Sequence, residues 1–311
     1  MTRISDEIAA AVSMCDREPI HIPGSIQPHG MLLALDEPDY RVEQASENCR
    51  SILAADSAGV CGRRVEEIFG DQNGSRLRAA LENAALKLEN NPEYLMSLQI
   101  GDQPYQALAH RREGILILEL ESGASTGSIG FSQVYGLVTR FMSDLAPAVS
   151  TEEMSSVAAR EVRRITGFDR VLIYRFDADL NGTVIAEDRN EELPSYLDLR
   201  FPASDIPAQA RELYRLNRLR MIPDADYVPS HIEPAVNPRT GRPLDLTFAT
   251  LRSVSPVHAQ YMKNMGTAAS MSVSILRDGK LWGLISCHHK LPRHASFEVR
   301  SACDIIAQLL S

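Results

Sequence analysis

The chain has 311 residues, which at about 150 residues per domain predicts two domains. Its composition, 44% hydrophobic and 23% charged residues, is that of a globular protein and excludes collagen, coiled-coil rods and mucin-type chains. The formal net charge of -9 argues against nucleic acid as a partner, because the phosphate backbone is bound by basic surfaces.

The start of the chain also argues against export or a membrane span. Asp6 and Glu7 interrupt it before a signal-type apolar run develops, and no later stretch approaches the ~20 apolar residues that cross a bilayer. The five cysteines are an odd number at irregular spacings without a CxxC pair, so neither a disulfide framework nor a structural zinc site is expected. We therefore expect a cytoplasmic protein with reduced thiols and no membrane partner.

The first predicted domain, residues 1–125, consists of an N-terminal arm and an α+β region. Alternating and branched apolar residues predict strands over 31–35, 40–46 and 115–121, and a helix is expected near 76–88. The Gly- and Ser-rich stretch after Gly123 marks the end of this domain.

The second predicted domain, residues 126–311, begins with a connector helix over 132–145. Ser150 and Glu153 have the spacing of a capping box, which predicts a helix that ends at Gly167. Strands are expected over 171–176, 184–186, 269–276 and 281–287, the first two joined by a turn at 181–182. Both domains are therefore predicted to be α+β, each with a mainly antiparallel sheet and flanking helices.

The last predicted helix runs from Phe297 to the end of the chain without a Gly or Pro stop signal, so we expect it to continue in a longer parent. Its apolar side and the connector helix are a candidate dimer surface. Packing against their own domain is the alternative.

Two proline-rich segments are candidates for holding a ligand. The extended arm of residues 15–30 places the nucleophilic thiol of Cys15 ahead of the first strand, although it also suits a capping arm with an idle cysteine. In segment 201–207, FPASDIP, prolines hold Phe201 and Ile206 extended, so stiff backbone carbonyls around Asp205 can accept hydrogen bonds. The alternative is that Asp205 is the N-cap of a helix over 208–213.

Other polar residues in the second domain suit a ligand with carboxylates. Arg220 and Arg252 carry guanidinium forks that bind carboxylates bidentately, with surface ion pairs as the alternative. Ser270 and Ser272 share one strand face by their period of two. The segment that follows Arg252 adds further polar groups, namely Ser255, His258 and Tyr261.

The strand-end sequence Cys287-His288-His289 does not favour a metal site, because neighbouring strand residues point to opposite faces. A single inward His288 that donates a hydrogen bond is the simpler interpretation, with a structural histidine as the alternative. No Walker, GxSxG or HExxH motif is present, so no conventional enzyme is predicted.

Taken together, the segments resemble the photosensory region of bacteriophytochromes, a biliverdin-binding pair of PAS and GAF domains. The motifs that carry the resemblance are Cys15 with EPIHIPGSIQPHG (18–30), GFDRVLIYRF (167–176), FPASDIPAQA (201–210), LRSVSPVHAQYMKNMG (251–266) and LWGLISCHH (281–289). The resemblance implies that a figure-of-eight knot joins the domains, with the N-terminal arm threading a long GAF insertion at about residues 225–247.

The resemblance also implies roles for individual residues. Cys15 would form a thioether with the A-ring vinyl group of biliverdin IXα; relatives that attach another bilin have a cysteine where this chain has Val257. Asp205, with its neighbour Ile206, would lie near the pyrrole nitrogens together with His258. The propionates would be bound by Tyr214, Arg220, Arg252, Ser255, Ser270 and Ser272. His288 would form a hydrogen bond with the carbonyl of ring D, and Tyr174, Phe201 and Tyr261 would surround that ring.

The implied function is that of a red/far-red photoreceptor fragment in which light isomerises the pigment. In a parent protein a following PHY domain would carry the signal to a histidine-kinase-type output, and the fragment itself would form a homodimer through GAF helices and fluoresce in the near infrared. Beyond attaching its own pigment it would not be an enzyme. A GAF module that binds another small ligand without covalent attachment is one alternative, and a purely structural dimerisation fragment is another.

Overall fold

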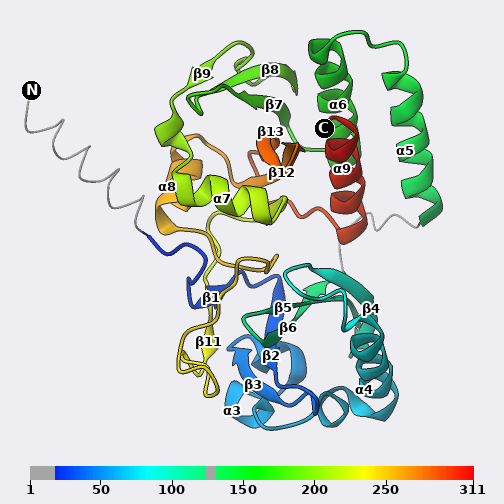
Figure 1. Cartoon of the computed structure of the whole chain (residues 1–311), viewed down its shortest axis with the longest axis vertical. Helices are drawn as coiled ribbons and strands as arrows, with labels where there is room; N and C mark the ends of the chain where they lie inside the picture. The colour runs from blue at the N-terminus through cyan, green and yellow to red at the C-terminus, as the bar shows by residue number, and fades with distance from the viewer. Residues whose placement is uncertain (1–17, 124–130) are drawn as a thin grey trace, which may run out of the picture. The chain divides into compact units, whose positions relative to one another are not determined.

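The computed structural model describes residues 18–123 and 131–311, which form two compact units, each built on one sheet (Figure 1). Residues 21–123 and 227–255 form the seven-stranded unit, and residues 131–226 and 256–311 belong to the six-stranded unit. All strands paired within the two sheets are antiparallel, which confirms the predicted α+β class. The domain boundary at residue 125 stays a prediction.

The seven-stranded sheet has the spatial order β1-β11-β3-β2-β6-β5-β4. Its strands are β1 (Ser25–Ile26), β2 (Gly30–Leu35), β3 (Val42–Ser46), β4 (Glu93–Ile100), β5 (Gln103–Arg112), β6 (Ile115–Ser122) and β11 (Ser230–Glu233). Its helices are α2 (Cys49–Leu53), α3 (Ser57–Val60) and α4 (Val65–Ala84). The predicted helix start near residue 76 was wrong, because α4 begins at Val65 and merely kinks at Gly70, whose φ is 77°.

The central strands of this sheet are apolar at nearly every position because both of their faces are covered. Met31, Leu33 and Leu35 of β2 pack in one core cluster, whereas Leu32 and Ala34 pack in another. The second cluster contains residues of the segment 227–255, namely Ile232, Leu244, Leu246, Ala249 and Leu251. A stretch from the second half of the chain therefore covers one face of the first sheet.

Polar contacts also attach the segment 227–255 to this sheet. Strand β11 pairs with both β1 and β3, and the backbone of Gln27 donates to the carbonyl of Leu251 at 2.7 Å. The buried carboxylate of Glu119 on β6 accepts hydrogen bonds from Thr250 N (3.0 Å) and Leu251 N (2.8 Å). The N-terminal arm is thus bonded to two parts of this long segment, while the knotted crossing itself stays a prediction.

The six-stranded sheet has the order β10-β12-β13-β7-β8-β9. Its strands are β7 (Arg170–Phe176), β8 (Gly182–Arg189), β9 (Arg200–Phe201), β10 (Leu219–Ile222), β12 (Ala269–Arg277) and β13 (Lys280–His289). The helices of this unit are α5 (Phe131–Leu145), α6 (Thr151–Thr166), the 3-10 helix η1 (Ala203–Asp205), α7 (Ala208–Leu216), α8 (Pro256–Asn264) and α9 (Phe297–Leu309).

Local signals fix α6, the helix that follows α5 in this unit. The Ser150 side chain accepts from Glu153 N at 3.1 Å, and Gly167 ends α6 with a φ of 64°, as predicted. The Glu153 carboxylate accepts from Val149 N rather than from Ser150 N, so only half of the capping box forms. Within the described ranges, no helix is long and apolar enough to cross a membrane.

Helices α5, α6 and α9 pack against one another, and α6 and α9 cover one face of the six-stranded sheet. Apolar residues of β7, β12 and β13 meet them there in the main core, which includes Phe141, Val162, Val171, Val273 and Ile306. Most of the apolar side of α9 therefore packs in the core of its own unit, although 36% of the Ile305 surface remains exposed to solvent. Helix α7 packs against β12 and β13 on the other face of the sheet, where most of the predicted site residues lie (Figure 1).

Candidate functional site

Polar side chains form rows on the sheet face opposite the main core. Ser270 on β12 is the partner of His288 on β13, and Ser272 is the partner of Ser286. Arg220 on β10 lies opposite Ser272. Because direct cross-strand partners project to the same face, the register brings these five side chains together, with Ser270 and Ser272 on one face as predicted.

An aromatic wall, made of Tyr174, Tyr196 and Phe201, lies on the same face. The ring centroids of Tyr174 and Phe201 are 6.1 Å apart, and those of Tyr196 and Phe201 are 6.3 Å apart. Ile206 packs against this cluster. Burial raises the pKa of the Tyr174 phenol to about 12, so this group remains a hydrogen-bond donor throughout the neutral range.

Two histidines add polar groups beside this wall. His288 Nε2 lies 3.1 Å from the Ser286 hydroxyl, whereas its buried Nδ1 has no hydrogen-bond partner among the described residues. On α8, the rings of His258 and Tyr261 stack with centroids 6.4 Å apart. Desolvation lowers the pKa of both His258 and His288 to about 4. Each imidazole is therefore neutral at pH 7 and can donate one hydrogen bond and accept another.

A cation lies at the β10 edge of the polar rows. The guanidinium carbon of Arg220 is 4.6 Å from the centroid of the Tyr214 ring, which is buried on α7. Arg220 forms no ion pair with any residue that the structure describes, so the expected surface ion pair is not found. A stacked guanidinium without a carboxylate partner is suited to bind an anionic group of a ligand.

The segment around Asp205 is held by a residue that the sequence did not single out. Asp205 ends η1, and Arg211 of α7 donates to the backbone carbonyls of Ala203 (2.7 Å) and Ile206. The alternative in which Asp205 caps the next helix was wrong, since Pro207 is the N-cap and no side chain caps α7. The carboxylate of Asp205 is exposed, and partial desolvation raises its pKa.

Comparison with known protein families matches both halves of the chain. Residues 15–123 match the PAS fold and residues 150–311 match the GAF domain. The chromophore-binding domain of Stigmatella aurantiaca phytochrome P1 superimposes with a TM-score of 0.88 at 46% identity, covering 96% of this chain and 98% of that one. The chain belongs to the bacteriophytochrome family. It is a phytochrome chromophore-binding domain with the PAS–GAF architecture.

Curated phytochromes extend beyond this PAS–GAF pair. Cyanobacterial phytochrome B of Nostoc sp. is 46% identical over 300 residues, and the bacteriophytochrome of Pseudomonas aeruginosa is 40% identical over 299 residues. Each alignment covers 96% of this chain but 40% of the relative. The chain thus spans about two fifths of the length of these phytochromes.

Three further residues were predicted for the pocket of this bacteriophytochrome domain. Arg252 and Ser255 belong to the seven-stranded unit, where buried Arg252 pairs with Ile26 in an isolated β-bridge. Cys15 lies outside the described residues. Their roles toward a pigment stay predictions.

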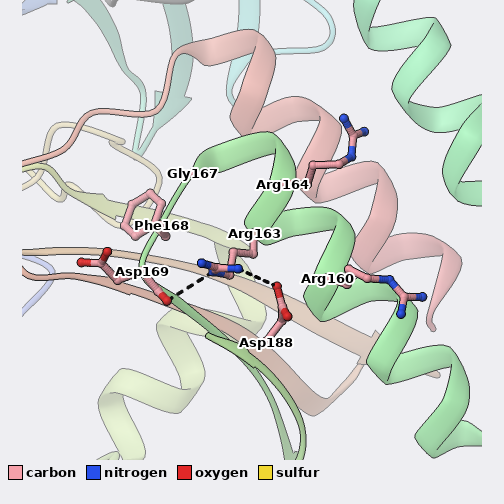
Figure 2. Close-up of a pocket in the computed structure, with 7 residues that line it drawn as sticks. All are labelled: Arg160, Arg163, Arg164, Gly167, Phe168, Asp169 and Asp188. Atoms are coloured by element: carbon pink, nitrogen blue, oxygen red, sulfur yellow. Dashed lines mark hydrogen bonds and ion pairs between the residues drawn. The ribbon is translucent and has the colours of Figure 1, made fainter. Parts of the chain in front are cut away.

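A separate groove of about 460 Å³ lies at the C-terminal end of α6 (Figure 2). Arg163 spans it, 3.2 Å from the Asp188 carboxylate and 3.3 Å from the Asp169 carbonyl. None of the predicted site residues lines this groove. The candidate site is therefore the polar sheet face and not this groove.

Three residues of the candidate site were not predicted from the sequence. Ser286 continues the alternation of Ser270 and Ser272 on the neighbouring strand, and that period could have indicated it. Tyr196 lies in a polar loop, and Arg211 acts through a contact across η1, so neither had a local signal.

Proposed function

We propose that this chain binds biliverdin IXα covalently through Cys15 and works as a red/far-red photosensor. In a longer parent it would drive a PHY domain and a histidine-kinase-type output. The observation that carries the proposal is the set of polar groups on one sheet face. It consists of Arg220, Ser270, Ser272, Ser286 and His288, and within residues 18–123 and 131–311 neither the Arg220 guanidinium has an ion-pair partner nor the buried Nδ1 of His288 a hydrogen-bond partner. The aromatic wall beside them suits a flat, conjugated ligand.

The polar groups fit the two propionates of a bilin. Arg220, backed by the Tyr214 ring, would bind one carboxylate as a guanidinium fork. Ser270 and Ser272 would donate hydroxyl hydrogen bonds to the other carboxylate or to a pocket water. Arg252 and Ser255 are proposed as propionate ligands from the family resemblance alone. Two carboxylates need cations and donors of this kind when they leave bulk water.

The remaining residues suit the pyrrole rings. Asp205, held by Arg211 through the carbonyls on either side of it, would accept hydrogen bonds from pyrrole nitrogens, with Ile206 and His258 nearby. Biliverdin would supply a conjugated tetrapyrrole whose double bond beside ring D isomerises in red light. His288 would donate to the ring D carbonyl, and Tyr174, Phe201 and Tyr261 would pack around that ring and sense its rotation. Two arrangements of these contacts would give the two states that light shifts.

The proposal extends to the behaviour of the fragment. Without a PHY domain we expect near-infrared fluorescence and incomplete red-to-far-red conversion, and no catalysis beyond attachment of its own pigment. We also propose a cytoplasmic homodimer formed through GAF helices. Tyr135 and Met142 of α5 are 66% and 46% exposed and would contribute apolar area to that interface.

Removing the Arg220 guanidinium tests the propionate site. We expect Arg220→Ala to slow attachment at limiting biliverdin about 10- to 100-fold, since a hydrogen bond to a charged group contributes about 1.5–3 kcal/mol. The rate is measured as the growth of red absorbance at several biliverdin concentrations. Arg215→Ala is the control, because Arg215 is an exposed arginine in the last turn of α7 and pairs with Glu212. Equal rates for Arg220→Ala and the wild type would exclude this role.

A further inference from the structure

A buried ion pair lies beside the aromatic wall. Arg170 begins β7 and Glu187 lies on β8, with Arg170 Nε 3.2 Å from Glu187 Oε1 and both side chains 5% exposed. Removing two charges from water costs several kcal/mol per ion, and their attraction often does no more than offset that cost. A role in shaping the site is therefore a better reason for this pair than stability alone.

The pair fixes the loop that carries Tyr196. The guanidinium carbon of Arg170 lies 3.8 Å from the centroid of the Tyr196 ring, and the same side chain donates to the Pro194 carbonyl. The Glu187 carboxylate accepts from Tyr196 N at 3.1 Å and from the Ser195 hydroxyl at 2.5 Å. Both the backbone and the ring of Tyr196 are thus held by one pair of charges, and Tyr196 in turn contacts Phe201 of the wall.

The same pair is also close to His288. Arg170 is the direct cross-strand partner of His288, so both side chains project to one sheet face. The groups that face His288 are Arg170 from β7, His258 from α8, and the hydroxyls of Ser270 and Ser286. After desolvation, the positive charge of Arg170 is the largest influence that lowers the pKa of His288.

We propose that the Arg170–Glu187 pair is a positioning device for the ring D end of the pocket, which sets the orientation of Tyr196 and places a cation on the same sheet face as His288. The inference rests on the proposed function, because it assigns the pair to the binding of a bilin ring. Neither residue needs to touch the pigment. Arg170 acts through Tyr196 and His288, and Glu187 acts by holding Arg170 and the loop 194–196.

Histidine titration in the pigment-free protein tests the electrostatic part. In ¹⁵N-histidine NMR spectra we expect His288 to protonate near pH 4 in the wild type. In Arg170→Gln it should protonate at least about one pH unit higher, because the cation that faces His288 is lost, while Glu187 keeps only Arg189, whose Nε lies 3.5 Å from Glu187 Oε2. Arg170→Lys retains the charge and should titrate like the wild type. The control is Arg175→Gln, an exposed arginine on the same strand that pairs with Glu152.

Emission from the pigment-loaded protein tests the positioning part. A lysine cannot stack a planar fork on Tyr196, so Arg170→Lys should lower the fluorescence yield several-fold although His288 titrates normally. If Arg170→Gln does not fold, the His288 titration and the emission of Arg170→Lys and Glu187→Gln still test the inference. Wild-type titration and emission in all three pair variants would overturn the inference. Absence of pigment uptake by the wild type would instead reject the proposed function. The NMR titration would still test the effect of Arg170 on the pKa of His288.

Discussion

A Cys15→Ser chain should take up biliverdin but lose it on denaturation. A thioether needs a nucleophilic thiolate, and the four cysteines that the structure describes are poor candidates for one. Cys49, Cys287 and Cys303 are buried and Cys61 is partly buried. Desolvation raises the pKa of each of these four thiols, to about 11 for Cys49 and about 12 for Cys303.

The measurement is the fraction of pigment that stays with the chain in acid urea. We expect this fraction to fall at least about tenfold in Cys15→Ser, because non-covalent contacts do not survive unfolding. Cys61→Ser is the matched control, since Cys61 is the most accessible of the four described thiols, and it should attach pigment like the wild type. Pigment retained by Cys15→Ser would refute attachment at this residue.

The second large effect is expected from Gly182→Ala at the start of β8. A Cβ atom added to Gly182 would lie 1.7–2.0 Å from atoms of the Tyr174 ring, which is itself 8% exposed. The ring has little free space, so the aromatic wall must shift. Overpacking of this kind costs about 1–3 kcal/mol. We therefore expect a lower melting temperature and, in the pigment-loaded protein, an altered red absorption band.

Another glycine provides a control with the opposite sign. A Cβ at Gly136, in the middle of α5, meets nothing within 4 Å. Gly136→Ala should leave the spectrum unchanged and stabilise the protein by about 0.5–1 kcal/mol, because alanine has the higher helix propensity. A Gly182→Ala protein that melts and absorbs like the wild type would show that Tyr174 is not fixed as the structure places it.

Local signals were sufficient where a segment folds by its own pattern. The branched and alternating residues of β6, the Ser150 cap and Gly167 predicted their elements correctly. The hairpin of β4 and β5 was missed, although Met96, Leu98 and Ile100 of β4 alternate with polar residues and this period of two could have indicated a strand. The reason why β2 is apolar at every position came only from the structure. Residues about 200 positions later in the chain cover the second face of this strand.

In the candidate site, too, local signals predicted some residues, and contacts made by folding determine the others. Its motifs pointed to Arg220, His258, His288 and the serines, because these residue types fit a ligand with carboxylates. The residues that hold the site depend on contacts between distant positions, such as Arg170 with Glu187. Register and loop placement decide those contacts, and neither can be read from composition or period.

The central claim is tested most directly by mixing the purified, pigment-free chain with biliverdin and recording its absorption before and after a red pulse, followed by denaturation in acid urea. We predict a red-absorbing band, near-infrared emission, partial conversion by the pulse, and pigment that remains bound in urea. A stable and complete far-red form would contradict the behaviour expected of the fragment. No uptake of biliverdin would contradict the account as a whole and leave a GAF module for another small ligand.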